Sequence, residues 1–554
     1  MQNAVLRLDS RDNVLTALRP LRKGERVSVP PHEYILATAV PAKHKVATES
    51  VPAGGELVMY GVLVGRATAP IQAGEVLTTR NVRHDAAGFR EKSFSENSGE
   101  YRWTAPDARK WRERTFAGYA RADGQVGTRN YWLVVPLVFC ENRNIAVLKQ
   151  AFEEELGLAA PNAYRQQVAR FAALYRQGKT DEIRRAELEK QTGESGRSRC
   201  FQNVDGVKFL MHESGCGGTR EDARNLCGLI AGYIHHPNVA GATVLSLGCQ
   251  NSQVGMLREE IQRRDRKFQK LLFVFEQQQA GSEFKMLSEA VRATFLGLVD
   301  ADQCRRTAAP LSRLCLGLKC GGSDGFSGIS ANPALGHVSD LIAALGGRTI
   351  LSEFPELCGV EQALIERSRS KEVADRFIQL MRDYAERARA ARSGLEMNPS
   401  PGNIRDGLIT DAMKSAGAAR KGGASPVTAV LDYPEYSREA GLNLQCTPGS
   451  DVECVTAQVG AGANIVLFTT GLGTPTGNPI APVVKISTNS DLAARMHDII
   501  DLDAGPIVLG DKTVEQMGEA ILDHVVAVAS GLTHTKAELA GQDDFIPWKR
   551  GISL

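Results

Sequence analysis

The sequence predicts an α/β protein that begins with an all-β module and continues into two α/β domains. Two observations support this prediction. Up to about residue 86 the chain runs in short β-like pieces separated by turn-forming Gly and Pro residues. From about residue 116 onward, continuous apolar runs alternate with helical stretches. Buried strands separated by helices are typical of a parallel sheet with both faces covered, so both α/β domains are expected to be Rossmann-like, with mainly parallel sheets.

The domains follow in order along the chain. Residues 1–86 form the all-β module, in which Gly turns precede short strands as they do in hairpins. Residues 87–115 are charged and aromatic without periodicity, as expected of an exposed linker. Residues 116–305 and 306–554 then each repeat the strand and helix pattern. We therefore predict a middle α/β domain and a C-terminal α/β domain.

The composition excludes several classes of partner. The 66 Lys and Arg residues nearly balance the 64 Asp and Glu residues, so no overall charge favours nucleic acid or an acidic membrane surface. The N-terminus lacks the apolar core of a signal peptide, and no stretch has the roughly 18 apolar residues of a membrane span. Eleven cysteines, an odd number, suit reduced thiols. We expect a cytoplasmic protein that acts on a small molecule.

Three predicted strands of the middle domain end on a cysteine. Cys140, Cys216 and Cys249 follow three different apolar runs, and His212 lies near the second of them. Because ligands of α/β sheets bind beyond the carboxyl ends of the strands, one rim could gather three thiols and an imidazole. Such a group suits iron or zinc. The alternative is that these cysteines only fill space at tight turns.

Two polar groups follow strands of the C-terminal domain. The first is a Gly-rich segment with Ser323 and Asp324, followed by Asn332, where backbone N–H groups and oxygens could bind an anion, a metal or substrate hydroxyls. The second contains Glu353 and Glu356, which could hold a divalent cation or act as general acid and base. The alternative for the glutamates is a helix N-terminus that favours negative charge.

Further polar loops are candidates for substrate binding. Asn398, Ser400 and Asn403 lie in one Pro-rich loop, and Thr474 lies in a Gly-rich one. The basic segment at His44 and Lys45 could receive a carboxylate, although an exposed basic triplet is more often a solvated turn. No Walker loop and no strand-turn-helix GxGxxG motif occurs, so nucleotide-driven or hydride chemistry has no support.

Taken together, the motifs resemble the altronate and galactarate dehydratase family, and the likeness covers nearly the whole chain. The segments that carry it are His44–Ala47, Asp123–Asn130, Gly215–Cys216, Gly248–Cys249, Cys320–Asp324, Asn398–Asn403 and Gly473–Pro475. The resemblance implies an N-terminal SAF-type, β-clip module and a catalytic C-terminal domain. It also implies a homodimer formed through the middle domain, and a hydro-lyase that converts a sugar acid to its 2-keto-3-deoxy product with Fe²⁺ or a similar divalent cation such as Mn²⁺.

The branch of the family is inferred from particular residues. The segment from Glu353 to Leu357 is most similar to altronate dehydratases. Leu472 and Ile404 stand where the family pattern has Arg and Lys, and Glu141 stands where Val is usual. Fewer cations favour a substrate with one carboxylate, so we expect D-altronate. The alternatives are a galactarate dehydratase, a related sulfo-lyase, or a non-catalytic paralogue that binds a sugar acid.

A mechanism follows as a hypothesis. Asp324, Glu353 and Glu356 are expected to build the metal site, with the three strand-end cysteines as the rival ligand set. His212 or Lys45 would transfer protons, with Glu353 as a further catalytic carboxylate. The segment with His44 and Lys45 would close over the substrate and exclude water.

Overall fold

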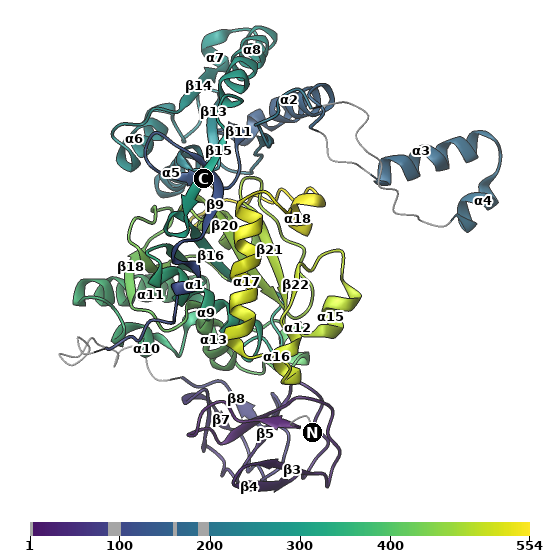
Figure 1. Cartoon of the computed structure of the whole chain (residues 1–554), viewed down its shortest axis with the longest axis vertical. Coiled ribbons are helices and arrows are strands. Elements are labelled where there is room, and N and C mark those ends of the chain that lie inside the picture. The colour runs from purple at the N-terminus through teal and green to yellow at the C-terminus, as the bar shows by residue number, and fades with distance from the viewer. Residues whose placement is uncertain (1–3, 87–100, 159–162, 187–198, 554) are drawn as a thin grey trace.

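A computed structural model describes residues 4–86, 101–158, 163–186 and 199–553. Half of the predicted linker, residues 87–100, lies outside the described residues. The N-terminal module lies at one end of the molecule, the C-terminal domain in the centre and the middle domain at the opposite end (Figure 1). The C-terminal domain therefore contacts both of the others.

The N-terminal module consists of short antiparallel strands around two apolar clusters. Its Gly-containing turns return the chain after each strand, as the sequence predicts. The strands are β1 (Val5–Leu6), β2 (Val14–Ala17), β3 (Arg26–Val29), β4 (His32–Ile35), β5 (Lys45–Ala47), β6 (Glu56–Met59), β7 (Val62–Ala67) and β8 (Val82–Arg83).

The middle domain is built on a parallel sheet in the order β12-β11-β13-β14. Its strands are β11 (Tyr131–Pro136), β12 (Gly206–Phe209), β13 (Val239–Ser246) and β14 (Leu271–Glu276). Its helices are α2 (Asn142–Glu155), α3 (Ala163–Arg176), α4 (Thr180–Arg185), α5 (Arg220–His235), α6 (Val254–Arg264), α7 (Gln277–Ala280) and α8 (Glu283–Ala301). A short helix and an antiparallel sheet join it to the C-terminal domain: α1 (Arg109–Arg112), β9 (Thr115–Ala120), β10 (Val126–Gly127) and β15 (Arg306–Pro310).

The C-terminal domain contains a parallel sheet in the order β18-β19-β17-β16-β20-β21-β22. Its strands are β16 (Cys315–Cys320), β17 (Arg348–Leu351), β18 (Val427–Leu431), β19 (Gly441–Gln445), β20 (Ile465–Thr470), β21 (Val483–Ser487) and β22 (Leu502–Asp503). Its helices are α9 (Ala331–Ala344), α10 (Glu361–Glu366), α11 (Lys371–Ala390), α12 (Pro401–Arg405), α13 (Asp411–Ala419), α14 (Asp451–Gly460), α15 (Ser490–Arg495), α16 (Gly505–Leu509), α17 (Val514–Ala529) and α18 (Lys536–Leu539).

The position of β16 decides where a ligand can bind. The chain passes from β16 to β17 on one side, whereas β20 lies on the other side. The strand order therefore reverses next to β16, and in open α/β sheets ligands bind at such a switch point, beyond the carboxyl ends of the strands. Every residue of β16 and of β20 is buried, so only the loops that follow these two strands can reach a ligand.

The predicted fold class is confirmed: a strand-rich N-terminal module precedes two α/β domains with parallel sheets. Among the helices that the structure describes, none combines the length and the apolar content needed to cross a membrane.

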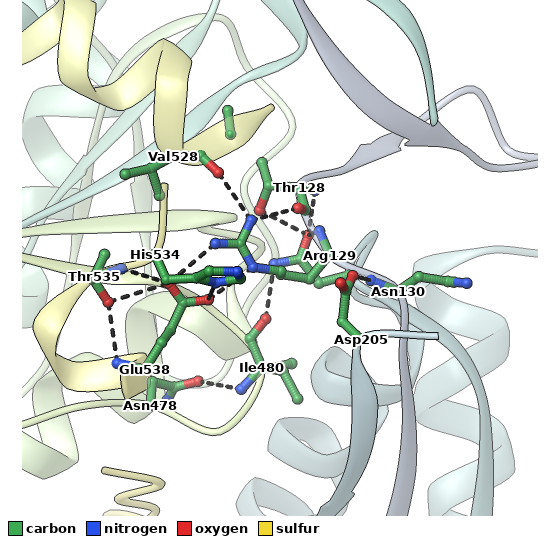
Figure 2. A network of polar contacts seen from close by, with 12 residues as sticks. Thr128, Arg129, Asn130, Asp205, Asn478, Ile480, Val528, His534, Thr535 and Glu538 are labelled. Carbon is green, nitrogen blue, oxygen red and sulfur yellow. Dashed lines mark hydrogen bonds and ion pairs between the residues drawn. The ribbon is translucent and has the colours of Figure 1, made fainter. Parts of the chain in front are cut away.

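A buried ion pair joins the middle domain to the C-terminal domain (Figure 2). Arg129 lies just before β11, and its guanidinium donates to both carboxylate oxygens of Glu538 on α18, at 2.7 and 3.0 Å, and to the carbonyl of Val528 at 2.9 Å. Burial opposes the charge of Glu538, but a hydrogen bond from His534 and the charge of Arg129 outweigh it and lower the pKa of Glu538 to about 2. The pair holds the two domains together at the amino ends of their sheets.

Candidate active site

Two predicted glutamates meet inside the C-terminal domain. Glu353 follows β17 and accepts hydrogen bonds from Lys319 of β16 and, at 2.6 Å, from Lys421. Its backbone has a φ of 68°, a conformation that non-glycine residues rarely adopt and that is found more often at functional sites. Glu356 forms an ion pair with Lys414 at 2.9 Å. All of these side chains are buried or nearly so, hence the pairs are shielded from water.

Cys320, the last residue of β16, connects the two glutamates. Its thiol lies 2.8 Å from Lys421 Nζ and donates to Glu356 Oε2 at 3.5 Å. Burial raises the pKa of this thiol to about 12, against the attraction of Lys421, so it stays protonated. Burial disfavours the charge on Lys319, but Glu353 and Asp451 outweigh it and raise the pKa of Lys319. We call Lys319, Cys320, Glu353, Glu356, Lys414, Lys421 and Asp451 the lysine-carboxylate network.

The network tests whether a divalent cation fits the predicted glutamates. Ligand atoms of Cys320, Glu353 and Glu356 lie within 4.8 Å of one another, as metal ligands do. However, the three ammonium groups of the network already balance its three carboxylates, and each glutamate accepts from a lysine. A divalent cation would add two uncompensated positive charges to a buried site and would compete for the same lone pairs. The residues as arranged therefore do not fit such an ion.

Asp324 belongs to a second group, to which the N-terminal module contributes. Its fully buried carboxylate lies 3.0 Å from Lys43 Nζ and accepts from Thr488 at 3.0 Å and from Ser327 at 3.1 Å. Lys43 also pairs with Asp406 at 3.0 Å. Asp324 is therefore separate from the two glutamates, and it anchors the N-terminal module to the end of β16.

Lys45 lies beside this second group and is almost completely buried. It is 1% exposed, and its Nζ donates to the carbonyls of Lys43 at 2.6 Å and Gly325 at 3.4 Å. Burial lowers the pKa of Lys45 to about 7, against the attraction of Asp324, and the charge of Lys43 adds to the lowering. A substantial fraction of this amine is thus neutral near pH 7 and can accept a proton.

The remaining predicted residues divide into two sets. Around the switch point, Ser323 Oγ is buried without a hydrogen-bond partner, and Asn398 accepts from Lys414 at 2.5 Å. A Cβ at Gly322 would lie 2.9 Å from Thr474 Oγ1, so Thr474 borders the same loop. Ser400 and Asn403 cap α12 through a capping box, and the side-chain amide of Asn403 also donates to the carbonyl of Ser323 at 2.7 Å.

Three further predictions fall on side chains with other partners. Asn332 on α9 is bonded to Thr469 at 2.6 Å and to the carbonyl of Gly417 at 3.1 Å. His44 contacts the carbonyl of Arg405 at 3.1 Å, and burial lowers its pKa. His212 lies in the middle domain, where both ring nitrogens contact backbone groups. It lies on the same rim as Cys140, Cys216 and Cys249, apart from the network.

The sequence interpretation missed the lysines of the network. Lys319 had one signal, because it is a charged residue inside an otherwise apolar buried strand, and such a residue is rarely fully buried unless it is paired. The sequence gives no such signal for Lys414 and Lys421, because only the folded chain brings them to the glutamates.

Comparison with known proteins gives the family. Three family models match in succession: an altronate/galactarate dehydratase SAF domain at residues 3–85, a D-galactarate dehydratase/altronate hydrolase second domain at residues 118–302, and a D-galactarate/altronate dehydratase C-terminal domain at residues 311–553. The chain is 32% identical to altronate dehydratase of Bacillus subtilis and 34% identical to altronate dehydratase of Escherichia coli, over 99% of each chain. It is 29% identical to galactarate dehydratase (L-threo-forming) of E. coli, over 97% of this chain and 94% of the relative. The resemblance stated from the motifs is thus confirmed, and the chain belongs to the D-galactarate/altronate dehydratase family of hydro-lyases.

Proposed function

We propose that this enzyme removes water from an aldonate, D-altronate in the first place, and releases a 2-keto-3-deoxy acid. The observation that carries the proposal is the buried amine of Lys45, whose pKa of about 7 suits a general base. Two full-length relatives are altronate dehydratases, which supports the same substrate. The chemistry requires a base because the proton beside a carboxylate is only weakly acidic.

Residues at the switch point could transfer protons and bind the substrate. Neutral Lys45 would accept the proton beside the substrate carboxylate. The ammonium so formed can return a proton to the hydroxyl that leaves the neighbouring carbon as water, and the resulting enol rearranges to the 2-keto product. Ser323 Oγ, buried without a partner, is available to a substrate hydroxyl.

The preference for one carboxylate rests on Leu472. This side chain borders the Gly-rich loop, since a Cβ at Gly322 would lie 3.2 Å from Leu472 Cβ. A guanidinium at this position would reach the same loop and could bind the second carboxylate of a diacid. Leucine cannot pair with a carboxylate. A diacid would therefore leave its second carboxylate unpaired in this site, which disfavours diacid substrates.

The test is a screen of the reduced, iron-loaded protein against aldonic and aldaric acids, with detection of 2-keto-3-deoxy product. We expect product from D-altronate and about tenfold lower efficiency with galactarate, and we expect Leu472→Arg to narrow that difference. Ligand binding without any product would favour the non-catalytic alternative. Product from galactarate alone would favour the aldarate branch.

The proposed assembly is a homodimer formed through the middle domain in the cytoplasm. One face of α8 carries exposed apolar side chains at helical spacing: Phe284, Val291, Phe295 and Val299, with exposed fractions of 83, 38, 41 and 42%. Apolar stripes of this kind mark association surfaces, and a second copy would cover this one. We also retain iron, with manganese as an alternative, as the proposed metal, although the glutamates of the network do not suit it.

A further inference from the structure

Three neighbouring strands of the middle domain lead to a cysteine at the same edge of the sheet. Cys140 follows β11, Cys216 follows β12, and Cys249 follows β13. β11 lies between the other two and is parallel to both, so their carboxyl ends reach one rim. The function proposed above does not use these thiols.

The loops that carry the three cysteines are tied to one another. The N–H of Phe139 donates to the carbonyl of Ser214 at 3.0 Å, and the N–H of Asn251 donates to the carbonyl of Gly215 at 2.9 Å. The hydroxyl of Ser252 contacts the carbonyls of both Leu137 and Gly215. Each loop is thus bonded to a neighbour within one or two residues of its cysteine, which fixes the rim without any ligand.

Two of the cysteines are positioned by a glycine that no other residue could replace without strain. Gly215 precedes Cys216 with a φ of +101°, and a Cβ there would lie 2.2 Å from the carbonyl oxygen of Leu137. Gly248 precedes Cys249 with a φ of +121°, and a Cβ there would lie 2.6 Å from Gln278 Oε1. The sharp backbone turns direct the following thiols to the rim.

All three thiols are exposed at this rim. The space-filling alternative applies instead to cysteines such as Cys227 and Cys454, which are fully buried. Exposed thiols that share one rigid rim can bind a soft ligand.

The spacing favours a cluster over a single ion. Thiolates around one tetrahedral zinc ion lie about 3.8 Å apart, given a Zn–S bond of about 2.3 Å. Within the described parts of the chain, the three thiols are not among the groups whose ligand atoms all lie within 4.8 Å of one another. His212, the other soft donor nearby, has both ring nitrogens on backbone groups at 2.8 and 3.2 Å. Within the described residues, the rim thus offers three thiols that are not all within 4.8 Å of one another, and its nearby imidazole is already bonded to the backbone.

We propose that Cys140, Cys216 and Cys249 bind an iron–sulfur cluster of the four-iron, four-sulfide type and leave one of its irons without a protein ligand. A cavity of ≈ 250 Å³ borders Cys216 and is also lined by Asp222, Trp548 and Lys549. The site thereby gives the expected iron a place apart from the lysine-carboxylate network.

The test is anaerobic reconstitution of the full chain with ferrous iron and sulfide under reducing conditions. We expect roughly four irons and four acid-labile sulfides per chain, with visible charge-transfer absorption and a paramagnetic signal on reduction. Cys140→Ser, Cys216→Ser and Cys249→Ser should each lose most of the bound iron and sulfide. Cys200→Ser, at another exposed thiol, should retain both.

Other outcomes would overturn the assignment. They are one zinc or iron per chain without sulfide, or full cluster content in the triple serine variant. Circular dichroism of the variants checks their folding, which exposed Cys→Ser changes should preserve. Because iron, sulfide and the paramagnetic signal are measured without substrate, the result does not depend on which sugar acid the enzyme converts.

Discussion

At the scale of single residues, the proposed base Lys45 makes the sharpest prediction. Replacement with Arg keeps a positive charge but removes a group that can be neutral near pH 7. We expect Lys45→Arg to lower kcat about 10²- to 10⁴-fold, the usual contribution of a general base. Steady-state turnover measures this loss. Lys23→Arg, on an exposed turn of the same module, should retain wild-type turnover.

The proposed base also predicts the pH dependence of the wild-type enzyme. Because the base acts as the neutral amine, kcat/KM should rise as pH increases through about 7 and then level off. If kcat/KM instead rose only around pH 10.5, the ordinary pKa of a lysine, the result would contradict a buried base at this position.

The lysine-carboxylate network makes a prediction about stability. Glu353→Gln leaves Lys319 and Lys421 buried with one carboxylate fewer, so we expect a loss of about 3 kcal/mol. Adding Lys421→Met removes one of the surplus charges and should recover part of that loss. Urea unfolding of the single and double variants measures both effects. Equal stability of wild type and Glu353→Gln would show that the charges are not coupled.

At the scale of elements, the buried ion pair between Arg129 and Glu538 connects the middle domain to the C-terminal domain. Arg129→Met leaves the carboxylate of Glu538 buried without its main cation, so we expect a loss of about 3–5 kcal/mol. Arg266→Met, on an exposed turn, is the matched control.

The pH dependence of this joint has a definite sign. The pKa of Glu538 is about 2 in the folded protein and 4.5 as its ordinary value. The stabilisation is therefore complete above about pH 4.5 and is lost as pH falls toward 2, because the unfolded chain binds the proton first. In Arg129→Met, stability should fall less steeply between these values. An unchanged slope would assign the acid sensitivity to other carboxylates.

The elements also show how far the sequence could predict the site. Lys45, Ser323 and Glu353 follow turns or strand ends, where polar residues are visible against apolar runs. The pairing of Glu353 with Lys421 could not be predicted from the sequence. Lys421 lies 68 positions away and reaches Glu353 only because η7 (Arg420–Gly422) packs beside β17. The sequence analysis placed Asp324 in one metal site with the glutamates because all three are carboxylates. In the structure Asp324 instead pairs with Lys43 of the N-terminal module. Long-range pairings depend on the fold and leave no periodicity to read.

At the scale of the whole molecule, the exposed stripe on α8 predicts self-association. Phe284→Glu places a charge on its most exposed apolar side chain, so it should convert the dimer to a monomer by light scattering. Leu532→Glu, at an isolated side chain with 81% exposure, should leave the dimer intact. A monomeric wild-type chain would contradict this assembly.

The N-terminal module docks on the C-terminal domain at the end of β16. The N-terminal module supplies Lys43 and Lys45 to the end of β16, and Thr410 near α13 donates to the carbonyl of Val64 at 2.7 Å. The sequence analysis expected the segment with His44 and Lys45 to close over carboxylates of the C-terminal domain, but it did not foresee the three lysines of the network. The proposed active site is therefore complete only when the module is docked on the C-terminal domain.

The central claim is that this enzyme dehydrates an aldonate with Lys45 as base. The most direct test is turnover of D-altronate by the anaerobic, iron-loaded wild-type protein and by Lys45→Arg, with the 2-keto-3-deoxy acid as the measured product. The account predicts rapid product formation by the wild type and a loss of at least about 10²-fold in the variant. Equal turnover by both proteins, or no product from the wild type, would contradict it.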